Sequence, residues 1–245
     1  MIFLQQARVH ILGVPFDQVT LKVAVERIAT FLDSTAAHQV VTANPEGVML
    51  AQQDKDLAQA VKAADLVVAD GIGVVWAAQK LGQPLPERVP GIELTQRLLQ
   101  LAAEKGYGVY ILGGAPGVAE EAAAKLAAQF PGLNIVGFHH GYFDEQAGVK
   151  IEQDIKAAAP HLLLVGLGMP KQEIWIHRRG KKLGVPVAIG VGGSLDVFAG
   201  RVKRAPSWMC KLGLEWFYRL VTQPQRAVRM LALPRFAWQV WRSKH

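Results

Sequence analysis

Five polar residues in this chain have the types and the positions to do chemistry: Thr42, Asn44, Asp70, Arg88 and Gln172. Asp70 follows a short apolar run and precedes a glycine, which leaves room for a ligand. A carboxylate in such a place can accept a proton from a hydroxyl group. An aspartate here could equally cap the helix that follows. Asp70 therefore predicts either a general base or a helix cap.

Arg88 and Asn44 also have two interpretations. Arg88 lies in a loop rich in proline and glycine, and a guanidinium suits a diphosphate. The alternative for Arg88 is a surface ion pair with Glu87. Asn44 precedes Pro45, so it could simply be the N-cap of a helix that begins with proline. Taken singly, these residues do not distinguish a ligand site from local structure.

A glycine-rich turn, Gly113-Gly114-Ala115-Pro116-Gly117, joins an apolar run to an alanine-rich segment. Backbone N–H groups at the start of a helix favour a phosphate group. The spacing matches neither a Walker A loop nor a complete G-x-G-x-x-G motif. A phosphate site and an ordinary tight turn are both consistent with it.

His139 and His140 invite a metal interpretation, which we reject. Adjacent side chains in an extended chain point in different directions, and no further ligand follows at a suitable spacing. The motifs of serine hydrolases, zinc proteases and thioredoxins are also missing. No metal site or cofactor is expected.

These residues need a scaffold, and the pattern of apolar runs predicts one. Short runs rich in Val, Ile and Leu alternate with segments of helical period, which indicates a parallel sheet covered on both faces. The predicted strands are Val9–Leu12, Gln39–Ala43, Leu66–Ala69, Gly108–Leu112, Asn134–Phe138, Leu162–Val165 and Pro186–Ile189. The predicted helices are Leu21–Leu32, Pro45–Ala51, Asp56–Ala63, Ile72–Leu81, Ile92–Lys105, Gly117–Gln129, Gln146–Ala158 and Lys171–Leu183. The fold class is a doubly wound, largely parallel α/β domain.

Ligands of such sheets bind beyond the carboxyl ends of the strands. Thr42 lies at the end of a predicted strand, and Asn44, Asp70, Tyr142 and Gln172 follow predicted strands. The glycine turns beginning at Gly113 and Gly192 do so as well. One rim of the sheet is therefore expected to gather most of the unusual residues.

The last 46 residues, from Gly200 to His245, carry nearly all of the charge imbalance. They hold ten Lys and Arg residues against one acid, Glu215, whereas the preceding 199 residues hold 17 basic and 19 acidic residues. Four of the six tryptophans also lie there. Cations and indole rings together favour an anionic membrane surface. We predict a core over 1–199 and a basic, helical, membrane-associating appendage over 200–245.

Several classes of protein are excluded by simple features. Cys210 is the single cysteine, which rules out an intramolecular disulfide and suits a reducing cytoplasm. No signal peptide is evident, and no apolar run reaches the roughly 18 residues that span a bilayer. The basic appendage lacks a nucleic-acid-binding module, so no nucleic-acid partner is expected. Any membrane contact is predicted to be peripheral.

The motifs occur together, in one order, in a known family. The chain from about residue 9 to residue 240 resembles the WecG/TagA/CpsF glycosyltransferases. The motifs that carry the resemblance are Val41-Thr42-Ala43-Asn44-Pro45-Glu46, Ala69-Asp70-Gly71-Ile72-Gly73, Arg88-Val89-Pro90-Gly91, Leu112-Gly113-Gly114, Gly166-Leu167-Gly168-Met169-Pro170-Lys171-Gln172-Glu173 and Val191-Gly192-Gly193.

The resemblance implies a metal-independent, inverting hexosyltransferase of cell-surface polysaccharide biosynthesis. Its donor would be a UDP-sugar, and its acceptor a sugar such as GlcNAc on undecaprenyl diphosphate. The enzyme would lie on the inner leaflet of the cytoplasmic membrane, and family members self-associate, which implies a homo-oligomer. N-acetylmannosamine or its uronic acid is the sugar expected, with glucose for exopolysaccharide or capsule as the alternative.

The resemblance also implies a role for each matching residue. Asp70 would be the catalytic base, with Thr42 beside it, and Thr42 and Asn44 would line the donor-sugar pocket. Arg88 would neutralise the leaving diphosphate, Gln172 would bind the sugar or the acceptor, and Tyr142 would stack on uracil. Gly113 and Gly114 would admit the UDP. Arginines of the appendage would complete the site, with Arg219, Arg226 and Arg229 as the candidates.

Two remote alternatives are an oxidoreductase that binds a dinucleotide and a non-catalytic membrane adaptor. The oxidoreductase should show a G-x-G-x-x-G near the first strand, which is missing. The adaptor would leave the polar residues of the rim without a role.

Overall fold

The computed structural model describes residues 8–222 and 230–243. Its centre is a six-stranded sheet in the order β4-β3-β8-β7-β5-β6, in which all neighbours are parallel. The strands are β3 (His38–Ala43), β4 (Leu66–Ala69), β5 (Gly108–Gly113), β6 (Asn134–His139), β7 (Leu162–Gly166) and β8 (Val187–Gly190). Each agrees with a predicted strand to within a residue or two.

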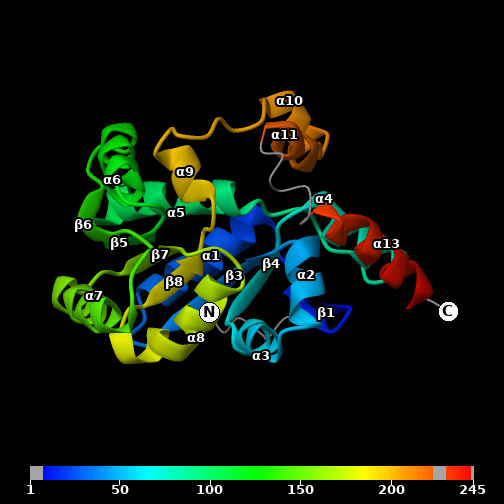
Figure 1. Cartoon of the computed structure of the whole chain (residues 1–245), viewed down its shortest axis with the longest axis horizontal. Helices are drawn as coiled ribbons and strands as arrows, with labels where there is room; N and C mark the ends of the chain where they lie inside the picture. The colour runs from blue at the N-terminus through cyan, green and yellow to red at the C-terminus, as the bar shows by residue number, and fades with distance from the viewer. Residues whose placement is uncertain (1–7, 223–229, 244–245) are drawn as a thin grey trace.

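Helices cover both faces of this sheet, as Figure 1 shows. Alternate residues of one strand enter opposite cores: Val40 packs on one side of the sheet and Val41 on the other. One face carries α1 (Leu21–Leu32), α5 (Gly91–Lys105), α6 (Val118–Gln129) and α9 (Ser194–Phe198). The other carries α2 (Pro45–Ala51), α3 (Lys55–Ala63), α4 (Ile72–Lys80), α7 (Glu145–Ala158) and α8 (Lys171–Leu183). The predicted doubly wound α/β class is confirmed.

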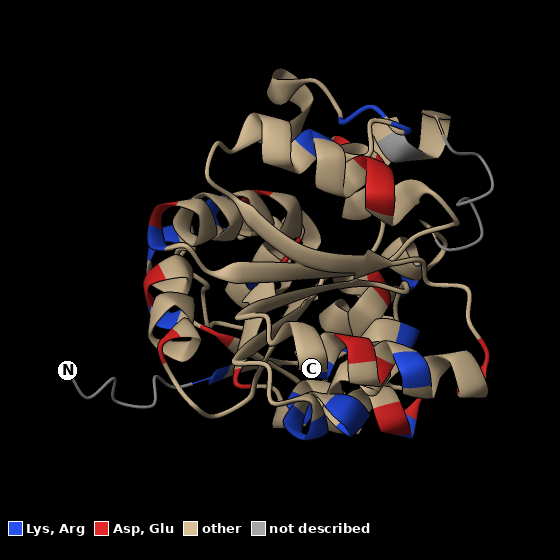
Figure 2. Ribbon diagram, turned by 90° about the vertical axis from the view of Figure 1, so that its left-hand side faces the viewer, with Lys and Arg blue, Asp and Glu red and all other residues tan. Residues whose placement is uncertain are grey.

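The charged residues lie on the helical layers and not on the strands of the sheet. None of the six strands contains Asp, Glu, Lys or Arg, and β4, β5 and β8 are buried along their whole length. Figure 2 shows the uncharged strands between two layers of helices that carry the charged residues.

The first strand is the exception to the sequence prediction. Val9–Leu12 was expected in the parallel sheet, but β1 (Arg8–Ile11) pairs antiparallel with β2 (Val14–Asp17) in a separate hairpin. The two turn residues, Leu12 and Gly13, both have positive φ, as a tight hairpin turn requires. A leucine is an unusual residue for that position, so β2 was missed.

Asp17 fixes this hairpin to the rest of the molecule. Its buried carboxylate accepts hydrogen bonds from Arg27 Nη1 at 2.8 Å and from the backbone N–H of Val67 at 2.8 Å. Arg8 Nε lies 3.3 Å from the same carboxylate. One side chain therefore ties β2 to α1 and β4.

The sheet has a switch in the direction of its connections between β5 and β7. From β5 the chain passes through α6 to β6, the edge strand next to β5. From β7 it passes through α8 to β8, which lies next to β7 in the opposite direction along the sheet. The two helices also cover opposite faces. Such a divergence leaves a crevice at the carboxyl ends of the two strands.

The segment after Gly200 contains α10 (Ser207–Lys211), α11 (Glu215–Thr222) and α13 (Ala232–Arg242). Two ion pairs attach its start to the core, Arg201 with Glu121 and Arg204 with Glu93. The helix α13 packs against α2 and α4 and lies beside them in Figure 1. Within 8–222 and 230–243, no helix is long and apolar enough to cross a membrane.

Candidate active site

A cleft of about 240 Å³ lies beyond the carboxyl ends of β3, β4, β7 and β8. The five polar residues singled out from the sequence all line it: Thr42, Asn44, Asp70, Arg88 and Gln172. They come from the end of β3, the turns that follow β3 and β4, the loop before α5 and the first turn of α8, and are brought together because parallel strands end at one rim.

Asp70 and Thr42 converge on one point. A β-carbon placed on Gly91 would lie 3.2 Å from Asp70 Oδ2 and 3.1 Å from Thr42 Oγ1. The Thr42 hydroxyl lies 3.4 Å from the carbonyl oxygen of Gly190 and donates to it. Since α4 has Gly71 in its cap position, Asp70 is not the capping residue. A carboxylate and a hydroxyl thus face the same small space.

Asn44 is the N-cap of α2, as the alternative interpretation predicted. Its side-chain oxygen accepts a hydrogen bond from the backbone N–H of Gly47 at 2.8 Å. The cap uses only the oxygen of the amide, so the NH₂ group can still donate to a ligand in the cleft. Capping and ligand binding are compatible for this residue.

Gln172 links two turns of the rim. Its side-chain oxygen accepts hydrogen bonds from the backbone N–H groups of Gly168 at 3.1 Å and Gly192 at 3.0 Å. Its amide nitrogen donates to Glu173 Oε1 at 2.8 Å. Gln172 is only 4% exposed, so its side chain contacts other residues of the protein rather than solvent. Gln172 therefore positions the turns after β7 and β8.

Glu173 is a buried carboxyl behind this link. Only 1% of the residue is exposed, and Oε2 has no hydrogen-bond partner within the described part of the chain. Burial raises the pKa of the Glu173 carboxyl to about 7, against the smaller opposing effect of the hydrogen bond from Gln172. Ionisation of this group therefore falls near neutral pH.

Arg88 is held by the segment after Gly200 rather than by its neighbour. Its guanidinium lies 3.7 Å from Glu215 Oε2 and donates to the carbonyl oxygen of Cys210 at 3.3 Å. The alternative pairing with Glu87 is wrong, because that carboxylate accepts the N–H of Leu21 at the start of α1. The one acid of the appendage thus pairs with a cation of the cleft.

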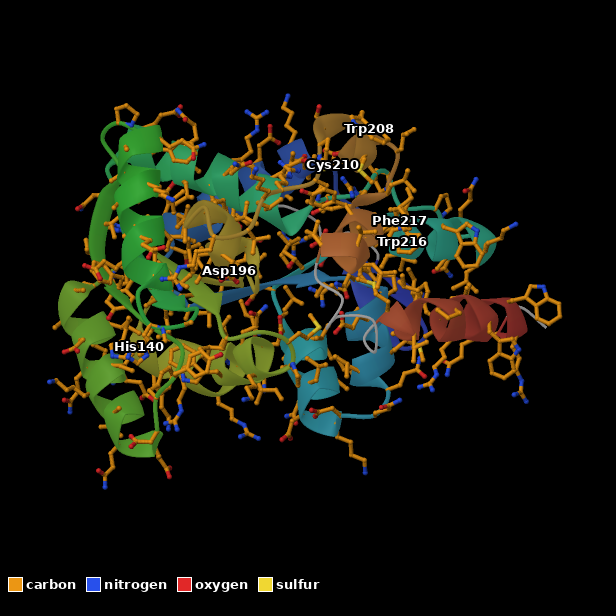
Figure 3. All side chains as sticks on the ribbon, turned by 45° about the horizontal axis from the view of Figure 1, so that its top comes forward. His140, Asp196, Trp208, Cys210, Trp216 and Phe217 are labelled. Carbon is orange, nitrogen blue, oxygen red and sulfur yellow. The ribbon has the colours of Figure 1, made fainter. Side chains whose placement is uncertain are left out.

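The remaining predicted residues lie elsewhere. Gly113 and Gly114 are at the β5/β7 crevice, where a β-carbon on Gly113 would meet the backbone of Gly166 at 2.5 Å. Tyr142 is 72% exposed, beyond β6. Figure 3 shows its neighbour His140 well apart from Trp216, which lines the cleft. No group of three metal-binding side chains was found among the described residues.

The candidate arginines of the appendage are not placed by the structure. Arg219 belongs to α11, but its side chain is not described, and Arg226 and Arg229 lie outside the described residues. The described part of the appendage has an aromatic surface: Trp208, Trp216 and Phe217 project from α10 and α11 (Figure 3), and α13 exposes Trp238 and Trp241.

Three residues near the site were missed from the sequence. Glu173 falls on the buried stripe of α8 with Ile176 and Gly180, and an acid in such a stripe was the available signal. Gly91 was quoted only as part of a motif, although its missing side chain makes room for the reacting groups. Glu215 gave no signal, because its partner Arg88 is more than a hundred residues away in the sequence.

Comparison with known proteins shows what the chain is similar to. The model of the glycosyl transferase WecG/TagA/CpsF family matches residues 9–245. An N-acetylglucosaminyldiphosphoundecaprenol N-acetyl-beta-D-mannosaminyltransferase of Staphylococcus aureus strain NCTC 8325 is 39% identical over 240 residues, which are 97% of this chain and 94% of that protein. The same enzyme from strain MRSA252 is also 39% identical over 240 residues.

Proposed function

Because this chain belongs to the WecG/TagA/CpsF family of glycosyl transferases, we propose that it transfers N-acetylmannosamine from a UDP-sugar to GlcNAc on undecaprenyl diphosphate. The identity of 39% with an enzyme named for that sugar and acceptor, over nearly the whole of both chains, supports this choice. The observation that carries the chemistry is the convergence of Asp70 and Thr42 beside Gly91.

In this proposal Asp70 is the general base. Its carboxylate takes the proton from the 4-hydroxyl of the acceptor GlcNAc as that oxygen attacks the anomeric carbon of the donor. The bond from this carbon to the diphosphate breaks, UDP leaves, and the configuration at the carbon inverts. Thr42 and the NH₂ group of Asn44 hold the donor sugar in place for the attack.

The charges of the cleft favour a contribution from the appendage. The described side chains that line it include the carboxylates of Glu46, Asp70 and Glu215 but a single cation, Arg88. A leaving diphosphate needs more positive charge than that. We assign the missing charge to Arg219, Arg226 and Arg229, with no metal ion, and expect the diphosphate to replace Glu215 as the partner of Arg88.

We place the nucleotide part of the donor at the crevice between β5 and β7. The turn Gly113-Gly114 and the turn beginning at Gly166 meet there, since Gly114 N–H donates to the carbonyl oxygen of Gly166 at 3.0 Å. Close approach of a phosphate to such turns is favourable. Tyr142, exposed nearby in the chain, is the proposed platform for uracil.

The acceptor is a membrane lipid, so the enzyme must work at a membrane. The exposed tryptophans and the basic residues of 200–245 support a peripheral position on the cytoplasmic leaflet. Self-association, as implied by the family resemblance, belongs to the same proposal.

UDP release from full-length protein, given a short-chain prenyl-diphosphate-GlcNAc and a panel of UDP-sugars, tests the function. We expect release that depends on the acceptor, with UDP-N-acetylmannosamine as the preferred donor and no loss in EDTA. Preference for UDP-glucose would overturn the choice of sugar. Release that requires a divalent cation would overturn the role given to the arginines.

A further inference from the structure

An apolar groove of about 480 Å³ adjoins the catalytic cleft. It lies between α4, α11 and α13, and none of the described residues that line it is charged. Trp76, Leu220, Leu231, Phe236 and Ala237 line the groove but not the cleft. A depression of this size with apolar walls is typical of a ligand site.

The groove and the cleft form one continuous depression. Six residues line both: Pro45, Ile72, Gly73, Trp216, Met230 and Leu233. Ile72 lies two residues after Asp70 and is 49% exposed. The boundary between the polar and the apolar part therefore lies close to the proposed base, as a ligand with a polar head and an apolar tail requires.

We propose that this groove binds the first isoprene units of the acceptor's polyprenyl chain. The proposal rests on the proposed function, because it takes the acceptor to be a sugar linked to a prenyl diphosphate. The lining of the cleft includes glycine turns at Gly168 and Gly192 as well as the apolar residues Ile72 and Trp216, and of these only the apolar residues also line the groove. With the donor diphosphate on the glycine side, the lipid of the acceptor leaves through the apolar side.

The shape of the groove favours a single chain over a bilayer surface. Phe236, one of its lining residues, is only 2% exposed, so it lies below the more exposed Leu231 and a flat membrane surface cannot contact it. Removing apolar chain from water in such a groove stabilises the complex. Binding of the chain also holds the acceptor hydroxyl near Asp70, which contributes to the rate as well as to affinity.

Acceptors that differ only in their lipid test the groove in solution without membranes or micelles. GlcNAc-diphosphate esters of farnesol and of a short alcohol are compared in wild type, Ala237→Phe and Gln239→Phe. Ala237 lines the groove, whereas Gln239 lies on the same helix and does not. We expect wild type and Gln239→Phe to prefer the farnesyl acceptor at least tenfold in kcat/KM, and Ala237→Phe to lose the preference but to keep its activity with the short acceptor. Leu220→Gln serves as a second groove variant if Ala237→Phe lowers the melting temperature.

Calorimetric titration with farnesyl diphosphate and with inorganic diphosphate separates this proposal from the function itself. Tighter binding of farnesyl diphosphate that Ala237→Phe abolishes supports the groove, even if no donor sugar is transferred. Transfer without any preference for chain length, with equal binding of both diphosphates, overturns the groove and leaves the function standing. An equal loss in Gln239→Phe also overturns it, because the effect would then belong to the general surface of α13.

Discussion

The rim of the sheet and the appendage, residues 200–245, hold their side chains by different means. On the rim, Gln172 is bound to the backbone of two turns and Asn44 to the backbone of α2. The appendage is attached by ion pairs, such as Arg201 with Glu121, and by two buried residues of α13, Phe236 and Val240. Its large aromatic residues are mostly exposed.

This difference indicates that the rim and the appendage have separate roles. Under the proposed function, the rim positions the base and the donor sugar before the acceptor arrives, which is what efficient chemistry needs. In the same proposal, the appendage adds charge and apolar surface where the diphosphate and the lipid bind. Its contribution to the reaction should therefore be separable from the stability of the core.

Removing positive charge from the appendage should have the largest effect, and it tests whether the appendage serves the reaction without stabilising the core. We expect Arg226→Ala/Arg229→Ala to lower kcat/KM about 100-fold, because the leaving diphosphate loses its partners. The melting temperature should not change. Arg242→Ala, which removes a cation over the Trp238 ring on α13, is the control and should retain activity. Substitution is preferable to truncation because α13 buries Phe236 and Val240 against the core.

Stability should depend on the buried ion pairs of the core and little on the exposed ones of the appendage. Asp17→Ala removes the carboxylate that Arg8, Arg27 and the Val67 N–H share, and should lower the free energy of unfolding by about 3 kcal/mol. Glu121→Ala breaks only the exposed pair with Arg201 and should have no resolvable effect. Urea unfolding followed by circular dichroism measures both, and equal losses would contradict the comparison.

Glu173 makes the stability of the rim depend on pH. Its pKa is about 7 in the folded chain, against an ordinary value of 4.5, so the unfolded chain releases this proton at lower pH. Wild type should lose up to about 3 kcal/mol of stability between pH 4.5 and about 7 from this group. Glu173→Gln keeps an acceptor for Gln172 and should remove that loss. Urea unfolding at pH 5 and pH 8 checks it, and an equal pH dependence in the two proteins would refute it.

Gly91 offers the smallest perturbation of the rim. A β-carbon there would crowd Thr42 Oγ1 and Asp70 Oδ2 at 3.1 and 3.2 Å. We expect Gly91→Ala to lower kcat about tenfold through misplacement of the base. Stability should be nearly unchanged, because Gly91 opens α5 and its backbone does not need positive φ. Wild-type kcat in this variant would show that the space beside Gly91 is not used.

Much of the core could be predicted from sequence, for physical reasons. The strands β4, β7 and β8 are apolar on both faces, so they appear as uninterrupted apolar runs. The cleft residues could be predicted because polar residues directly after such runs must meet at one rim. The hairpin was predicted only in part, since the Leu12-Gly13 turn carries no familiar turn signal.

Contacts between distant parts of the chain could not be predicted in the same way. Nothing local marks Glu215 as the partner of Arg88, or Phe236 as part of the core beside β1 and β2. The apolar groove depends on how α13 packs against α4, which is a matter of tertiary packing rather than of pattern. These contacts are what join the appendage to the site.

A single-turnover experiment with Asp70→Asn tests the central claim most directly. Full-length wild type and variant are saturated with acceptor and mixed with a limiting amount of UDP-sugar, and the affinity for UDP is measured in parallel. The account predicts that the variant binds UDP like wild type and transfers the sugar about a thousandfold more slowly. Transfer at the wild-type rate would contradict it, because the base would then have to be a residue other than Asp70.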